Sequence, residues 1–201
     1  MSETPTHSHH VPGAHIANPA PLGLAGFALT TFVLSTVNSN IIPQALVGGA
    51  LGAALGYGGL AQFAAGLWEF AKGNTFGATA FCSYGGFWIS FWWLAEHDLA
   101  NLGPDGHKVV GVYLLGWTIF TAYMAVAAVK VNMAVLGVFV LLTITFLALS
   151  IGWFDDVSTG WIKLGGYLGL ATALVAWYAS FAGVVASTWG REVLPVGAPG
   201  E

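Results

Sequence analysis

Charged side chains are scarce in this chain. Of its 201 residues only 7% are charged, whereas 56% are hydrophobic and the mean hydropathy is +0.74. Soluble domains carry about 25% charged residues, so this composition excludes an ordinary soluble protein and indicates an integral membrane protein in contact with the lipid bilayer. The five Lys and Arg residues form no cluster and the formal net charge is −4, which excludes nucleic acid as a partner.

Reactive and metal-binding side chains are also missing where chemistry would need them. Cys82 is the single cysteine, and no Asp, Glu, Lys, Arg or His lies near the middle of an apolar stretch; Glu69 and Glu96 lie near the ends of two. Haem, catalytic zinc, a retinal Schiff base or intramembrane hydrolysis would each need such a residue. No cofactor, metal site, catalytic residue or enzymatic activity is therefore expected, and no relay of protein carboxylates for protons.

Uncharged stretches predict the membrane spans. Residues 16–68 contain neither charge nor histidine, enough for two helices of about 20 residues, with a break at 38–43. The other stretches, each 21 to 27 residues long, are 73–95, 109–129, 131–154 and 164–190. The sequence thus predicts an all-α integral membrane protein with six transmembrane helices.

One membrane domain, residues 17–197, is expected between a disordered N-terminal tail, residues 1–16, and a C-terminal tail, residues 198–201. The N-terminal tail has four histidines but no apolar core, so a flexible polar tail is favoured over a signal peptide or a loose metal site. Six spans put both termini on one side of the membrane. Three of the five basic residues (Lys72, Lys130 and Arg191) would share that side, which favours cytoplasmic termini in a cell-membrane protein.

The first span has a well-marked beginning. Asn18 is expected to cap it, with Pro19 at the first helical position, where its missing N–H costs nothing. The free N–H groups and the positive end of the helix dipole would suit an approaching carboxylate. A capped membrane helix without any ligand is the simpler alternative.

Small residues recur at intervals of four in two spans. Gly48, Gly52 and Gly56 lie in the second span, and Gly165 and Gly169 in the last. This spacing lets helix backbones approach closely. It is consistent both with a self-associating oligomer and with close packing inside one subunit.

Uncharged polar residues lie inside the expected spans, among them Thr30, Thr31, Asn38, Gln62 and Tyr84. Such groups most often hydrogen-bond neighbouring helices, but they can also line a narrow path for a small solute. Physical chemistry alone leaves two possible functions: a channel or facilitator for a small neutral or weakly charged molecule, and a purely structural membrane protein.

The motif Asn18-Pro-Ala-Pro-Leu-Gly-Leu24, followed by Gly26-Phe27 and Thr30-Thr31, resembles the signature of the acetate uptake transporter (AceTr) family. The resemblance continues through Tyr57-Gly-Gly, the stretch from Glu69 to Phe81, and Ser83-Tyr84-Gly85. It ends at Val193-Leu-Pro-Val-Gly197 and so covers nearly all of residues 17–197.

The resemblance implies six helices around a central pore, a hexameric assembly, and passage of acetate and other short monocarboxylates, with succinate in some members. It places the pore constriction at Phe27, Tyr84 and Leu142. The substrate path would then include the residues Asn18, Leu22, Gly23, Thr30, Thr31, Asn38, Gln62 and Glu69.

An apolar constriction disfavours a bare carboxylate far more than its neutral acid, so a coupled proton is expected to cross with the substrate. Two alternatives are a non-conducting sensor or assembly protein and a path for ammonia or ammonium. The sequence has no visible cation-stabilising aromatic cage that would favour the latter.

Overall fold

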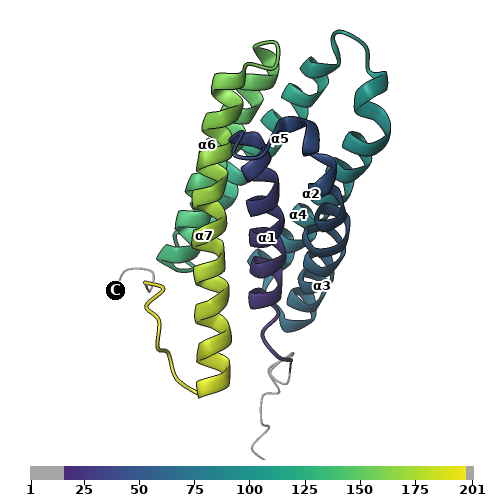
Figure 1. The fold of residues 1–201 in the computed structure, drawn as a ribbon. Helices are drawn as coiled ribbons and strands as arrows, with labels where there is room; N and C mark the ends of the chain where they lie inside the picture. The colour runs from purple at the N-terminus through teal and green to yellow at the C-terminus, as the bar shows by residue number, and fades with distance from the viewer. Residues whose placement is uncertain (1–15, 198–201) are drawn as a thin grey trace, which may run out of the picture.

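A computed structural model describes residues 16–197, and every regular element in that range is helical (Figure 1). Of the tails expected at 1–16 and 198–201, residues 1–15 and 198–201 lie outside the described residues. The main helices are α1 (Ala20–Asn38), α2 (Gly48–Ala53), α3 (Gln62–Lys72), α4 (Thr75–Trp93), α5 (Gly106–Ala128), α6 (Met133–Phe154) and α7 (Thr159–Trp189). Short elements are the 3-10 helices η1 (Gln44–Leu46) and η4 (Leu99–Asn101) and the π-helices η2 (Ala54–Ala61) and η3 (Leu94–Asp98).

Five helices of the described chain are long and apolar enough to cross a membrane. They are α1, the continuous helix Gln44–Lys72, α5, α6 and α7. Helix α4 has 19 residues but does not reach the apolarity of these five. The prediction of an all-helical protein of membrane type is therefore confirmed, and the sixth span is taken up below.

The helices run up and down in one bundle. Helix α1 packs against α7 on one side and against η2 and α3 on the other, while α7 packs on α6, α6 on α5, and α3 on α4. The beginnings of α1, α4 and α6 lie at the end of the bundle that also carries both ends of the described chain (Figure 1). We call this the terminal end, and the opposite end, with the α1–η1, α4–α5 and α6–α7 connections, the loop end.

Helix α1 begins one residue later than the sequence predicted. Pro19 is the capping residue and Ala20 the first helical one, since the Pro19 carbonyl accepts the first hydrogen bonds of the helix, from the N–H groups of Leu22 and Gly23. The predicted boundary, with Asn18 as the cap and Pro19 as the first helical residue, is therefore off by one residue. The predicted hydrogen bond is present, because the Asn18 side chain accepts from Ala20 N at 3.3 Å, and it also accepts from Lys72 Nζ at 2.9 Å.

The second membrane helix contains the irregular segment η2. The Thr30 hydroxyl donates to the carbonyl of Ala53 at 3.2 Å, just before η2 begins. A Cβ on Gly26 would lie 2.7 Å from the Tyr57 carbonyl oxygen, so only glycine lets α1 approach η2 this closely. The sequence did not predict this irregularity, which is common where a helix contributes to a functional site.

The two glycine patterns have different surroundings. A Cβ on Gly48, Gly52 or Gly56 would meet nothing within 4 Å, whereas one on Gly165 would lie 2.6 Å from the Leu149 side chain. The pattern in α7 therefore serves packing within the subunit. The pattern in the second helix leaves an open face on the described part of the chain.

Candidate transport path

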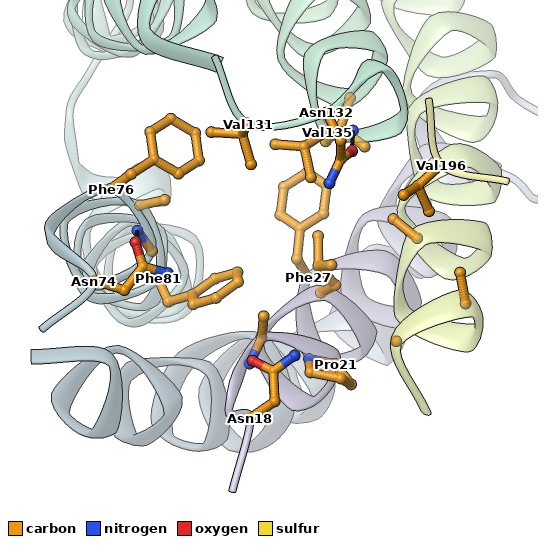
Figure 2. A pocket seen from close by; sticks show the side chains of 18 of the residues that line it. Asn18, Pro21, Phe27, Asn74, Phe76, Phe81, Val131, Asn132, Val135 and Val196 are labelled. Atoms are coloured by element: carbon orange, nitrogen blue, oxygen red, sulfur yellow. Dashed lines mark hydrogen bonds between the residues drawn. The ribbon is translucent and has the colours of Figure 1, made fainter. Parts of the chain in front are cut away.

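A cavity of about 430 Å³ opens at the terminal end, between α1, α4, α6 and α7. Asn18, Asn74 and Asn132 stand around this terminal cavity on three sides (Figure 2). Asn74 caps α4 by accepting a hydrogen bond from Gly77 N at 3.1 Å, and Asn132 caps α6 through Val135 N at 2.8 Å. Because α1, α4 and α6 all begin here, the positive ends of three helix dipoles converge on the mouth of the cavity.

The C-terminal segment after α7, residues 191–197, folds back over one side of this mouth. The carbonyls of Val196 and Gly197 accept hydrogen bonds from Ala134 N at 3.0 Å and Met133 N at 2.9 Å. Tyr178 of α7 donates to the Pro195 carbonyl at 2.6 Å. This terminal strap thereby covers the first N–H groups of α6, and its Glu192 is the one charged residue of the described chain that lines the terminal cavity.

A second cavity of about 260 Å³ lies toward the loop end. Its wall is mainly apolar, made of aliphatic side chains and aromatic ones that include Phe87, Trp88, Tyr113 and Trp153, and none of the described residues that line it is charged. At the same end of the bundle the hydrogen bond from Lys108 lowers the pKa of the exposed Asp105 carboxyl, which keeps that carboxyl ionised at neutral pH.

The terminal and loop cavities have only two lining residues in common, Phe27 of α1 and Leu142 of α6. Both side chains are almost fully buried, 4% and 3% exposed. Tyr84 of α4, 3% exposed, lines the terminal cavity beside them, with its ring centroid 5.7 Å from that of Phe27. These three residues, which the resemblance had named, thus lie together where the two cavities meet.

Tyr84 is held by aromatic rings and by one hydrogen bond. Its ring lies 5.4 Å from Phe120, 5.9 Å from Trp117 and 6.0 Å from Phe139, centroid to centroid. Its hydroxyl lies 2.9 Å from the Thr121 hydroxyl of α5, which is fully buried. Water is therefore excluded from all sides of the tyrosine except the cavity.

Three other residues of the expected path line the cavities. Gln62 lines the terminal cavity, and Thr31 and Asn38 line the loop cavity. Within residues 16–197, Gln62 Oε1, Thr31 Oγ1 and the indole nitrogen of Trp88 are buried without a hydrogen-bond partner. An unpartnered buried polar group costs about 1–3 kcal/mol, so its presence in the wall of a cavity is consistent with a role in binding a solute.

Other expected path residues do not reach either cavity. Leu22 is 46% exposed on the outside of α1. Gly23 packs against the Phe81 ring, 2.7 Å from where its Cβ would be, and Thr30 hydrogen-bonds Ala53. Gly23 and Thr30 lie at contacts that α1 makes with α4 and with the second helix.

Glu69 is fully buried directly behind the wall of the terminal cavity. Its Oε2 accepts a hydrogen bond at 2.8 Å from the side-chain amide of Asn74, the residue that caps α4. Its Oε1 has no partner among the residues that the structure describes. The carboxyl therefore orients a residue that lines the cavity but does not itself line it.

Sequence reasoning missed several lining residues. Phe87 and Trp88 line the loop cavity, and Thr121 lines neither cavity but hydrogen-bonds Tyr84. No local pattern marks these positions, because their roles depend on which helix faces them. Asn132 had a detectable signal, since it directly precedes a long apolar run and a side-chain cap is favoured there.

Comparison with known proteins identifies the family. The model of the GPR1/FUN34/yaaH family matches residues 2–196. This chain belongs to that family. Relatives include Acetate permease A of Emericella nidulans, 40% identical over 90% of this chain, and Ammonia transport outward protein 2 of Saccharomyces cerevisiae, 45% identical over 84%. The Succinate-acetate/proton symporter SatP of Escherichia coli is 40% identical over 90% of this chain.

The GPR1/FUN34/yaaH relatives differ in length. This chain spans 96% of the Escherichia coli protein but only 61% of the yeast protein and 65% of the Emericella protein. Among solved structures, that of the bacterial acetate channel SatP matches with a TM-score of 0.83 and 39% identity, over 90% of this chain and 99% of that chain. The prediction of the family is confirmed, and the chain is a membrane protein with the fold of an acetate channel.

Proposed function

We propose that this protein conducts acetate and related short-chain carboxylates, including succinate, across a membrane. The observation that carries the proposal is the arrangement of two cavities that meet at Phe27 and Leu142, with Tyr84 beside them. The relatives named as an acetate permease and a succinate-acetate/proton symporter support it. Its action is transport and not bond-breaking chemistry.

The path begins in the terminal cavity, where three helix N-termini attract a carboxylate and Lys72, hydrogen-bonded to the lining residue Asn18, adds positive charge beside the mouth that offsets the lining Glu192. At the constriction the aromatic and aliphatic side chains replace water, so the charged form is strongly disfavoured there relative to the neutral acid. The substrate therefore crosses this point as the acid, or with a proton, and is released into the loop cavity.

The membrane arrangement is part of the same proposal. Helix α4 forms the sixth span because it packs on α3 and supplies Tyr84. Both termini lie in the cytoplasm, so the terminal cavity opens inward. The open glycine face of Gly48, Gly52 and Gly56 supports assembly into a hexamer, since small residues without a neighbour let another subunit approach.

Uptake of labelled acetate into liposomes that contain the purified protein tests the transport proposal. Membrane voltage and a pH gradient are imposed separately, and empty liposomes are the control. We expect uptake that follows the pH gradient. Absence of uptake under both conditions overturns the proposal and favours the non-conducting sensor or assembly protein; uptake of methylammonium without acetate favours the ammonia alternative that one relative's name suggests.

Glu69 provides a test of the route of the proton. If the proton crosses with the substrate, Glu69→Gln keeps the pH dependence of acetate uptake, because the amide still hydrogen-bonds Asn74. Acetate flux that loses its pH dependence in this variant while its rate is unchanged would assign the proton to the Glu69 carboxyl.

A further inference from the structure

Tyr84 lines the terminal cavity beside Phe27, and the hydrogen bonding of its hydroxyl group has a direction. Thr121 Oγ1 lies 2.7 Å from the carbonyl oxygen of Trp117 and 2.9 Å from the hydroxyl of Tyr84. A carbonyl oxygen can only accept, so the single hydroxyl proton of Thr121 is donated to Trp117. The Thr121 oxygen is then the acceptor for Tyr84, which donates its own single proton to it.

This arrangement leaves the Tyr84 oxygen with lone pairs and no free proton. No other hydrogen bond of that hydroxyl occurs among residues 16–197, and the ring is enclosed by Trp117, Phe120 and Phe139. Tyr84 lines the terminal cavity, and to a solute that reaches its hydroxyl the oxygen offers only an acceptor. A carboxylic acid can donate its O–H to such an atom. A carboxylate has no proton to donate, and its oxygen lone pairs are repelled by those of the Tyr84 oxygen.

We propose that Thr121 is a positioning residue that makes the Tyr84 hydroxyl an acceptor and thereby selects the protonated acid over the carboxylate at the constriction. This inference deepens the proposed transport function and rests on it. The selection acts in a dry aromatic environment, where the direction of a hydrogen bond matters more than in water. Thr121 itself lines neither cavity and acts through Tyr84.

The test is the ratio of acetate flux driven by a pH gradient to acetate flux driven by voltage, in liposomes that contain the full-length protein. Thr121→Val has nearly the same shape but no acceptor, so the Tyr84 proton is free to point into the path. We expect this ratio to fall by about tenfold, roughly the value of one hydrogen bond. Thr121→Ser keeps the hydroxyl and should restore the ratio toward that of the wild type.

Thr118→Val is the matched control. Thr118 lies one turn earlier on α5, donates to its own helix at the Leu114 carbonyl at 2.8 Å, and lines neither cavity. We expect the wild-type ratio in this variant. Thermal unfolding of all variants in detergent separates loss of folding from a changed ratio.

The possible results have distinct meanings. A wild type without acetate flux under either driving force overturns the transport proposal itself. A wild type that transports but whose ratio is unchanged in Thr121→Val overturns the role of Thr121, as does an equal fall of the ratio in Thr118→Val. A wild-type flux that follows voltage alone overturns selection of the acid while leaving acetate transport intact.

Discussion

The terminal and loop cavities share Phe27 and Leu142 but differ in the groups that surround a solute. The terminal cavity is the larger, about 430 Å³ against about 260 Å³, and carries asparagine side chains, an amide at Gln62 and the acidic Glu192. The loop cavity is lined mainly by aliphatic and aromatic residues, with the unpartnered hydroxyl of Thr31 and indole N–H of Trp88. The more polar terminal cavity thus adjoins the more apolar loop cavity.

On the proposed path, the two cavities therefore have different roles. The terminal cavity can gather a hydrated anion, because helix N-termini and amides replace part of its water. The loop cavity can accept a molecule that has already lost most of its water and charge, and offers it the unpartnered polar groups of Thr31 and Trp88. On the proposed path, the carboxyl group of the substrate has to be protonated before it passes the constriction between the two cavities.

The largest effect is expected from Phe27→Ala, which removes the ring that separates the two cavities. Truncation of this buried ring should cost about 3–5 kcal/mol of stability through the void it leaves. We expect the ratio of uptake of a larger monocarboxylate, such as lactate, to that of acetate to rise by about tenfold, because the pocket loses several methylene equivalents of contact. Competitive uptake in liposomes measures this ratio.

Phe32→Ala is the control for that experiment. Phe32 lies on the same helix and packs on Trp177 at 5.2 Å between centroids, but it lines neither cavity. It should lose stability without a change in the substrate ratio. The idea that Phe27 separates the cavities fails if both variants give the same ratio.

The second largest effect is expected from removing the amide of the terminal cavity with Gln62→Leu. The amide oxygen of Gln62 is buried without a partner in the described chain, so its loss should leave the melting temperature unchanged or raise it. The KM for acetate entering from the terminal end should rise by about threefold to tenfold, the value of one neutral hydrogen bond. A lower melting temperature with an unchanged KM would make Gln62 a structural residue.

Trp88→Phe tests the loop cavity in the same way and sharpens the comparison. The phenyl ring keeps most of the contact with Phe87, whose centroid lies 5.0 Å from that of Trp88, but removes the N–H donor. We expect about a threefold rise in KM for acetate that enters from the loop end, and a smaller rise from the terminal end. Oriented liposomes, loaded from one side or the other, measure both; equal rises from the two ends would contradict the assignment of Trp88 to one cavity.

The sequence predicted the class and part of the lining of the two cavities, for physical reasons that particular residues illustrate. Long uncharged stretches are unambiguous, so the helices were predicted, but α7 begins at Thr159 and includes Lys163, which the expected span 164–190 had left outside. A lysine near a helix end can extend its charge to the interface and need not stop the helix. Motifs near Phe27 and Tyr84 identified those residues through the family resemblance alone.

What the sequence could not predict depends on contacts between distant segments. The π-helical segment η2 arises where Gly26 and Thr30 of α1 meet the second helix, and no local pattern encodes that meeting. The role inferred for Thr121 depends on Tyr84 lying opposite it, 37 residues earlier in the chain. The strap over the terminal cavity likewise required knowing that Gly197 returns to the start of α6.

That strap leads to the smallest expected effect, from Tyr178→Phe. The substitution removes the 2.6 Å hydrogen bond to the Pro195 carbonyl, worth about 1 kcal/mol, and so should let residues 191–197 leave the surface more often. Trypsin cleavage after Arg191 should become about twofold to fivefold faster when local opening controls cleavage. Tyr167→Phe, which changes an exposed tyrosine on the same helix, is the control and should leave the rate unchanged.

Release of the strap also uncovers the N–H groups of Met133 and Ala134, which adds donors for an anion at the terminal cavity and none at the loop cavity. The KM for acetate should therefore fall slightly from the terminal end alone, and a fall from both ends would separate the strap from the difference between the cavities.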